Sequence, residues 1–379
     1  MVLLMISTVL TQNSKNKNSI LIIHIITTID LGGAEKQLLI LVNEQLKRGL
    51  KVMVIPLKGQ TTLEKDFLDL GCTVYSKITN QLVLCQILRI NKFLKKHENY
   101  ILHAHLPRAE MISRLLANHS RKLIISRHNA EQFIPGLPLY LSSLISRHVL
   151  KKAAAIIAIS NAVKHYLLNS RDAKDSMPIC VVPYGINSKP IKKAKTGKIK
   201  VTKKIYKIGT VARLVKQKNL ETLILSFAKY KILYPNSKLV IIGEGNQESC
   251  LFNLTKELMI SESIIWMKSI KNVDQVLKSI DLFVLPSLYE GFGLVYLEAM
   301  QAKIPIISSD NQAALEIFGE NAENLFEMKN IDSLVSKMIE FRSPSTRQKI
   351  LQRYKIILDR YSAEIMEDNI FKIYISEEE

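Results

Sequence analysis

The chain has 379 residues, of which 47% are hydrophobic and 23% charged, and its formal net charge is +19. This composition excludes a disordered or fibrous chain and is enough for two domains of ordinary size. The four cysteines form no Cys-x-x-Cys pair, which argues against a disulfide framework or a zinc site and favours a reducing, cytoplasmic compartment.

The N-terminal stretch, residues 1–19, holds a short apolar run with no basic residue before it and no small-residue cleavage pattern. The run is too short to cross a bilayer and does not match a secretory signal. We expect a loose N-terminal extension here. A tag that dips into a membrane surface is the alternative.

From residue 20 to residue 187, short β-rich runs alternate with helical patterns such as 34–48 and 83–96. The expected strands are 20–29, 51–57, 100–106, 123–128, 155–160 and 179–185. Strands that are apolar throughout and separated by helices indicate a parallel sheet covered on both faces. We therefore predict an N-terminal, acceptor-side α/β domain over 20–187.

The lysine-rich stretch 188–204 follows and is typical of a linker. The alternation then restarts over 205–350, which we predict to be a second α/β domain. Its expected elements in chain order are 206–214, helix 219–233, 238–245, helix 247–259, 263–267, 282–287, a helix from 293, and 304–308. A C-terminal helical segment, 351–379, belongs to a helical pattern over 345–375, which by itself allows packing on either domain.

The positive charge is concentrated in two stretches without acidic residues, 132–171 and 188–218. Nucleic acid, anionic lipid and phosphorylated substrates all suit such surfaces, but no helix-turn-helix, zinc-knuckle or RNP-type signature accompanies the charge, so we expect no nucleic-acid partner. The window 137–154 joins leucines and an aromatic residue to an Arg-His-Lys-Lys end. We expect it to contact an anionic membrane surface weakly; a plain domain helix with a basic solvated face is the alternative.

Open parallel sheets bind ligands at the carboxyl ends of their strands, so strand-to-helix loops are the candidate sites. Gly32 and Gly33 precede a helix whose free N–H groups could face an anion, although an ordinary tight turn fits equally. Arg213 and Lys218 suit a diphosphate, unless both are surface members of a lysine-rich stretch. Gly243 lies in a Gly-Glu-Gly without the third glycine of a dinucleotide fingerprint, and suits a loop passing close under a nucleotide.

The fourth loop contains Glu290, the turn 291–293 and Leu294 at a helix start, with Glu298 about one turn inside the helix. A helix N-terminus offers its positive end to a phosphate or a developing negative charge. The two carboxylates could accept hydrogen bonds from two groups of hydroxyls. The structural alternative is an amphipathic helix with one capping and one surface acid.

Taken in order, these loops resemble the retaining glycosyltransferases of family four, which have the GT-B fold. The motifs that carry the resemblance are Gly-Gly-x-Glu, a strand-ending Arg-His-Asn, Ala-Ile-Ser before a helix, 182-VPYGIN-187, Arg-x4-Lys, Gly-Glu-Gly and 286-PSLYEGFGLVYLEAM-300. The resemblance covers almost the whole chain from about residue 20 and is most specific over 282–308. It implies two Rossmann-like doubly wound domains facing across a cleft, with the C-terminal helix packing back on the first domain.

The resemblance also implies site residues and their roles. Glu298 would bind the ribose, Glu290 and the amides of 291–293 the donor sugar and phosphate, and Arg213 and Lys218 the leaving diphosphate. His128 would lie near the reaction centre and bind a hydroxyl of the donor sugar or the acceptor. The implied catalytic residues are Glu290, Arg213, Lys218 and His128, and the implied donor-binding residues are Gly32, Gly33, Gly243, Gly291, Phe292, Gly293, Leu294 and Glu298.

Considered alone, a histidine at a strand end is more often structural, and that is the role we expect for His103 and His105. The chain departs from the family pattern at Tyr184 and Asn187, where Asn and Asp are usual, and at Ser269, where glycine is usual beside the base pocket. These departures leave the base and sugar preference open.

The function implied is transfer of a sugar, with retention and without a metal, from a UDP- or GDP-linked donor to a saccharide or lipid-linked saccharide. Such a reaction would serve cell-surface polysaccharide or lipopolysaccharide synthesis, in the cytoplasm or peripherally on the inner face of the cell membrane. No cofactor besides the nucleotide-sugar co-substrate is expected. The alternatives are a GT-B-fold sugar-nucleotide epimerase or phosphorylase, and a non-catalytic binding protein.

Overall fold

The computed structural model describes residues 20–117, 120, 122–187, 205–268 and 273–376. The chain forms two compact units: the first combines Met1–Asn187 with Ser362–Glu379, and the second is Ser188–Tyr361. The predicted extension 1–19, the predicted linker 188–204 and Ser269 lie outside the described residues.

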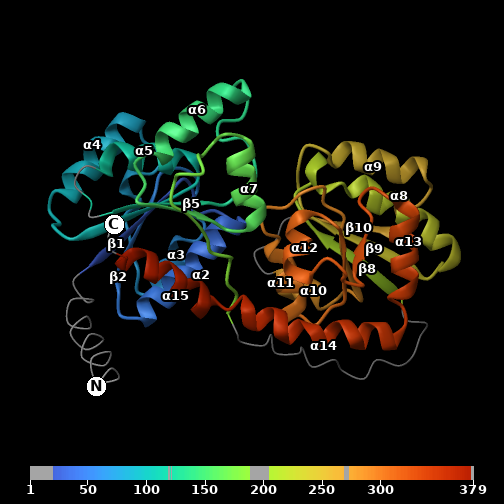
Figure 1. The fold of residues 1–379 in the computed structure, drawn as a ribbon. Coiled ribbons are helices and arrows are strands. Elements are labelled where there is room, and N and C mark those ends of the chain that lie inside the picture. The colour runs from blue at the N-terminus through green and yellow to red at the C-terminus, as the bar shows by residue number, and fades with distance from the viewer. Residues whose placement is uncertain (1–19, 118–119, 121, 188–204, 269–272, 377–379) are drawn as a thin grey trace, which may run out of the picture. The chain divides into compact units, whose positions relative to one another are not determined.

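The first unit is built on a parallel sheet with strand order β3-β2-β1-β4-β5-β6-β7. Its strands are apolar on both faces because helices cover both, with α4, α5 and α6 on one side and α2 and α15 on the other (Figure 1). The strands are β1 (Leu21–Ile26), β2 (Lys51–Pro56), β3 (Thr73–Val74), β4 (Tyr100–His105), β5 (Lys122–Arg127), β6 (Ala155–Ala158) and β7 (Ile179–Val181).

The helices of the first unit begin where local sequence favours a start. Pro107 occupies the first turn of α5, where its missing N–H costs nothing, and the Ser160 hydroxyl caps α7 by accepting from the Val163 amide. The helices are α2 (Gly33–Lys47), α3 (Glu64–Asp69), α4 (Val83–Leu94), α5 (Pro107–Leu116), α6 (Leu139–Leu150), α7 (Asn161–Asn169) and α15 (Ala363–Ile375).

The second unit repeats this arrangement with a parallel sheet in the order β10-β9-β8-β11-β12-β13. The strands are β8 (Tyr206–Val211), β9 (Ser237–Ile242), β10 (Ile264–Met267), β11 (Leu282–Leu285), β12 (Ile306–Ser309) and β13 (Leu325–Phe326). The helices are α8 (Leu220–Leu233), α9 (Glu248–Glu257), α10 (Val273–Leu277), α11 (Leu294–Gln301), α12 (Gln312–Phe318), α13 (Ile331–Glu340) and α14 (Pro344–Arg360).

Each sheet reverses its strand order once, between β1 and β4 in the first unit and between β8 and β11 in the second. In open α/β sheets, ligands bind at the carboxyl ends of the strands beside such a reversal. The two parallel, helix-covered sheets confirm the predicted pair of Rossmann-like domains.

The C-terminal pattern 345–375 is two helices rather than one, because the Ser362 hydroxyl accepts from the Ile365 amide and starts α15 afresh. Helix α15 packs on α2 in the first unit (Figure 1), where Arg48 pairs with Glu367 at 2.5 Å. The prediction that the C-terminal helix returns to the first domain is therefore confirmed.

Gly185 marks where the end of the first segment meets the start of α15. A Cβ at this position would lie 2.6 Å from the Cα of Ala363, so only glycine allows the approach. The Gln37 amide holds the turn by accepting from the Gly185 N–H at 3.2 Å and donating to its carbonyl at 3.0 Å, and the Ala363 N–H donates to the Ile186 carbonyl at 3.0 Å. Both segments of the first unit are thereby joined by backbone contacts.

Candidate functional site

Most of the predicted site residues lie in one group of loops in the second unit, at the carboxyl edge of its sheet. Arg213 and Lys218 follow β8, Gly243 follows β9 and Glu290 follows β11. Because β8 and β11 are the strands at which the order reverses, these loops occupy the expected ligand position of this fold. We call them the second-unit loop cluster.

The centre of this cluster is an ion pair between Lys218 and Glu290. The Lys218 ammonium donates to both Glu290 carboxylate oxygens, at 2.6 and 2.7 Å, and the Ser287 hydroxyl donates to Oε1 at 2.6 Å. The side chains are only 13% and 8% exposed. Removing either partner would leave a largely buried charge without compensation, so the pair fixes both side chains in place.

The loops that carry this pair are bonded to each other through their backbones. The Leu288 N–H donates to the Gln217 carbonyl at 2.8 Å, and the Gln217 side chain donates to the Tyr289 carbonyl at 3.0 Å. The Asn219 side chain donates to the Pro286 carbonyl at 3.2 Å. The two loops therefore form one rigid support, as a preorganised site requires.

Gly293 makes the turn that starts α11. Its φ of +83° lies in the left-handed region, and a Cβ there would stand 2.4 Å from the Tyr296 ring. Phe292 is buried, 2% exposed, and its ring packs edge-on against Tyr361, which anchors the turn. Leu294 begins the helix and Glu298 is half-buried on it, one turn from the N-terminus.

Gly243, which follows β9, is required by close packing against the loop after β8. Gly243 has φ +147°, and a Cβ there would come within 1.9 Å of the Ala212 carbonyl oxygen. The loops after β8 and β9 thus touch backbone to backbone, which brings Gly243 beside the segment that carries Arg213. Arg213 itself is exposed at this edge.

The first unit has its own group of loops at the carboxyl edge of its sheet, containing Gly32, Gly33, His128 and Tyr184. A Cβ on Gly33 would meet no atom within 4 Å, whereas a Cβ on Gly32 would lie 2.1 Å from Glu35 Oε2.

Both ring nitrogens of His128 are already engaged inside the first unit. Nδ1 lies 2.6 Å from the Tyr184 hydroxyl, and Nε2 lies 3.0 Å from Nδ1 of His105. Burial, assisted by the charge of Arg127, lowers the pKa of His128 to about 3, so the ring is neutral at ordinary pH. Tyr184 therefore contacts His128, one of the predicted site residues, directly.

Tyr184, which contacts His128, and Glu35, whose charge acts on Tyr184, were not among the predicted site residues. Tyr184 appeared in the sequence only as a departure from the family pattern, which was the available signal. Glu35, the acid of Gly-Gly-x-Glu, is buried and accepts from the Thr28 hydroxyl at 2.6 Å. Burial raises the pKa of the Glu35 carboxyl. Burial also raises the pKa of Tyr184, and the negative charge of Glu35 raises it further.

Helix α6 is amphipathic, but its buried face carries polar side chains and its exposed face carries apolar ones. Its buried face carries serines, of which Ser142 accepts from the Ile134 amide and Ser146 from the Arg127 guanidinium. Its outward face is apolar and consists of the exposed side chains of Leu139, Tyr140, Leu141, Leu144 and Ile145. A contiguous exposed apolar face of this kind marks an interaction surface.

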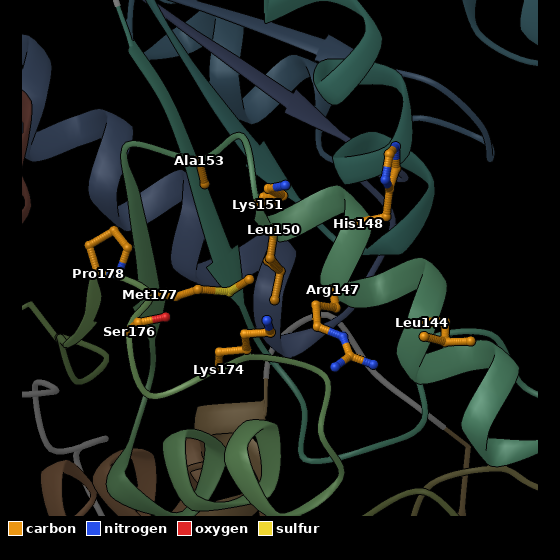
Figure 2. A pocket seen from close by; sticks show the side chains of 10 residues that line it. All are labelled: Leu144, Arg147, His148, Leu150, Lys151, Ala153, Lys174, Ser176, Met177 and Pro178. Carbon is orange, nitrogen blue, oxygen red and sulfur yellow. The ribbon is translucent and has the colours of Figure 1, made fainter.

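A pocket of about 600 Å³ adjoins the C-terminal end of this face. In Figure 2 the side chains of Arg147 and Lys174 point toward its middle, next to Leu150 and Met177. Lys151 contributes a third cation to the lining. Apolar walls with several cations suit an amphiphilic anion. Among the residues that the structure describes, none of the helices is long and apolar enough to span a bilayer.

Comparison with known proteins covers nearly the whole described chain. Residues 31–189 match the family model described as Glycosyltransferase Family 4, and residues 191–355 match the one described as Glycosyl transferases group 1. The chain is 25% identical to the capsular polysaccharide biosynthesis glycosyltransferase CapM of Staphylococcus aureus over 310 residues, which are 77% of this chain and 80% of that protein.

A second relative is the UDP-Gal:alpha-D-GlcNAc-diphosphoundecaprenol alpha-1,3-galactosyltransferase of Escherichia coli. It is 25% identical over 298 residues, 72% of this chain and 76% of that protein. Among solved structures, Anabaena HepE in complex with UDP-glucose superimposes with a TM-score of 0.77 at 16% identity, covering 93% of this chain and 99% of that one. At that identity the likeness establishes the shared fold.

Proposed function

The chain belongs to the glycosyltransferases of family four, and on that premise we propose that its second-unit loop cluster binds a UDP- or GDP-linked sugar donor. The observation that carries this proposal is the rigid Lys218–Glu290 pair beside the α11 N-terminus, at the strand-order reversal of the sheet. A carboxylate that accepts hydroxyls, a cation and free helix amides are the groups that a sugar diphosphate requires.

Each residue of the cluster has a proposed task. Glu290 accepts from a hydroxyl of the donor sugar and Glu298 from the ribose hydroxyls. Lys218 has three N–H bonds, and its two contacts with Glu290 leave one for a phosphate oxygen. Arg213 and the amides at the start of α11 bind the remaining oxygens. As the bond to the sugar breaks, the diphosphate gains negative charge, which these fixed donors stabilise.

We further propose that the reaction retains the anomeric configuration and needs no metal ion or cofactor. Arg213 and Lys218 supply the positive charge that a divalent metal supplies to phosphates elsewhere. Turnover should therefore persist in EDTA, and proton NMR of the first product should show the donor's anomeric configuration. Loss of activity in EDTA that Mg²⁺ restores, or an inverted product, would contradict this part.

Donor binding is tested by calorimetric titration with UDP-, GDP- and ADP-sugars in parallel, comparing Glu298→Ala with Glu320→Ala, an exposed acid outside the cluster. Because a hydrogen bond to a charged group contributes about 1.5–3 kcal/mol, Glu298→Ala should weaken binding of the accepted donor about tenfold or more. Glu320→Ala should leave the affinity unchanged. Equal affinities of both variants would refute the ribose assignment.

For the acceptor, we propose a saccharide, free or lipid-linked, of cell-surface polysaccharide synthesis. The name of the E. coli relative specifies a sugar linked to diphosphoundecaprenol as its acceptor. The outward apolar face of α6 and the cationic pocket next to it support weak contact with an anionic membrane surface, and hence a peripheral, cytoplasmic location.

Sedimentation with vesicles tests the membrane contact. The chain should bind vesicles containing anionic phospholipid and should bind neutral vesicles much less. Each cation near an anionic surface contributes about 1 kcal/mol, so Arg147→Gln together with Lys174→Gln should weaken binding by about thirtyfold. Leu144→Gln should also weaken it. Equal binding to neutral vesicles, or no effect of the double variant, would refute the contact with an anionic surface through these cations; no binding to either kind of vesicle would remove the membrane contact. Each result leaves the donor site unaffected.

A further inference from the structure

Three buried histidines of the first unit form a continuous row of hydrogen-bonded rings, and a fourth lies beside it. His24 of β1 lies 2.9 Å from His105 of β4, and His105 lies 3.0 Å from His128 after β5. His103 of β4 lies on the same side of the sheet, next to His24, with ring centroids 5.0 Å apart. All four rings are less than one-tenth exposed.

Two side chains from the covering helices complete the row. Gln45 of α2 accepts from His24 Nε2 at 2.9 Å and donates to the Tyr374 hydroxyl of α15 at 3.1 Å. Tyr374 lies 2.6 Å from His103 Nδ1, whose ring reaches the Ser126 hydroxyl at 2.7 Å. With Tyr184 at the other end, the row consists of Tyr184, His128, His105, His24, Gln45, Tyr374, His103 and Ser126.

The direction of the Gln45 amide assigns the protons of His24, His105 and His128. A neutral imidazole has one donor and one acceptor nitrogen, so fixing one nitrogen fixes the other. Because Gln45 Oε1 accepts, His24 must carry its proton on Nε2 and accept on Nδ1 from His105. By the same rule His105 accepts from Nε2–H of His128, and Nδ1 of His128 accepts from the Tyr184 hydroxyl.

The rule requires neutral rings, and burial provides them. It lowers the pKa of His24 to about 4 and of His128 to about 3, and it holds the pKa values of His103 and His105 well below their usual range. Turning the Gln45 amide over would reverse every donor and acceptor from His24 to Tyr184. One amide therefore separates two complete, oppositely directed sets of hydrogen bonds, and alignment within a set strengthens each bond.

We propose that Gln45 is a positioning residue for His128: its amide direction, relayed by His24 and His105, fixes the His128 tautomer and makes Tyr184 an acceptor toward any ligand. Because the Tyr184 hydroxyl donates its hydrogen to His128, the Tyr184 oxygen can only accept a hydrogen bond from any further partner. A sugar hydroxyl can donate, whereas an ionised phosphate oxygen cannot. The ligand part of this inference rests on the proposed function; the relay itself does not.

The same rings also raise the question of a metal. Nitrogens of His24, His103 and His105 lie within 4.8 Å of one another, a spacing at which a transition metal could be held. However, each of their ring nitrogens already has a hydrogen-bond partner in the row. The hydrogen-bonded row accounts for all six nitrogens, so we assign these residues to the relay.

The test is nitrogen NMR of the full chain labelled with ¹⁵N-histidine, which distinguishes a protonated from a bare ring nitrogen. His128→Gln assigns the His128 signals. The parent protein should show His128 with Nε2–H only. Gln45→Met, which changes a side chain that does not touch His128, should give a mixture of both His128 tautomers.

Tyr184→Phe is the matched control. It removes a direct partner of His128 but leaves the Gln45 end intact, so His128 should keep its proton on Nε2. Tyr374→Phe serves if Gln45→Met does not fold, because it removes one oxygen and frees the amide to turn; His128 should again become mixed. Circular dichroism verifies the fold of each variant.

Three results would overturn the inference: Nδ1–H on His128 in the parent, a single Nε2–H tautomer in Gln45→Met (or in Tyr374→Phe, where Gln45→Met does not fold), or one tightly bound transition metal per chain in the purified protein. If the tautomers change as expected but no nucleotide sugar binds or turns over, the relay stands and the proposed function fails.

Discussion

Acidification to pH 5 should destabilise the first unit, because its neutral histidines lie in the core. The pKa of His24 is about 4 and that of His128 about 3 in the folded protein, against an ordinary value of 6.5. Each therefore binds its proton more readily in the unfolded chain. Stability is full above pH 6.5 and is lost as the pH falls from there toward the folded values.

The size of the loss follows from the same numbers. At pH 5 the unfolded ring is almost fully protonated while the folded ring is not, so each of the two histidines costs about 2 kcal/mol relative to neutral pH. His103 and His105 change the stability in the same direction. The buried carboxyl of Glu110 acts in the opposite direction: burial raises its pKa to about 7, so its protonation between pH 7 and pH 5 stabilises the folded unit by about 2 kcal/mol. The net loss from His24, His128 and Glu110 is therefore about 2 kcal/mol, against a whole stability of about 5–15 kcal/mol for a domain.

Urea unfolding between pH 7 and pH 5 measures this loss, with the two units followed separately. Trp266, the single tryptophan, lies in β10 and reports the second unit by fluorescence. Hydrogen exchange of the amides in β1 and β4 reports the first unit. His165→Gln, at an exposed position of α7, should show the parent pH dependence. If the first unit loses no stability between pH 7 and pH 5, the neutral buried row is wrong.

Three other changes are predicted. Lys218→Ala should destabilise the second unit by about 3–5 kcal/mol because the buried Glu290 carboxylate loses its counter-charge and keeps only the Ser287 hydroxyl. Adding Glu290→Gln should restore part of the loss; Trp266 fluorescence in urea measures both variants, and equal stability of the single and double variants would contradict the pairing. Gly243→Ala should cost about 1–3 kcal/mol by the same assay, since its Cβ meets the Ala212 carbonyl; an unchanged midpoint would contradict that approach. Gly185→Ala should destabilise the first unit and leave the Trp266 transition unchanged, as hydrogen exchange would show.

The sequence was sufficient for the features that depend on local pattern. Continuous apolar runs between amphipathic helices predicted two parallel sheets because each strand must bury both faces. The Gly-Phe-Gly turn before α11 was recognisable because its last glycine needs a positive φ. The break between α14 and α15 was not predicted, since a serine within an amphipathic pattern does not reveal that it caps a new helix.

The contacts that join distant segments could not be predicted from the sequence. Nothing in the spacing of Gln45, His24 and Tyr374 shows that they meet, because the encounter depends on which face of the sheet each helix covers. His103 and His105 were expected to be structural, and both are buried and hydrogen-bonded. The Lys218–Glu290 bond likewise joins residues that the sequence assigned to different tasks.

The return of α15 to the first unit has a consequence for the order of events on the ribosome. Residues 363–375 emerge only after the entire stretch 205–361, so the second unit is free to fold while the first still lacks a helix. Until then the β1–β4 face is covered by α2 alone, the apolar side chains beneath α15 stay exposed, and Tyr374 is the last partner to reach His103 and Gln45. The earlier-synthesised unit is thus completed later, and during translation it is the one in need of chaperone protection.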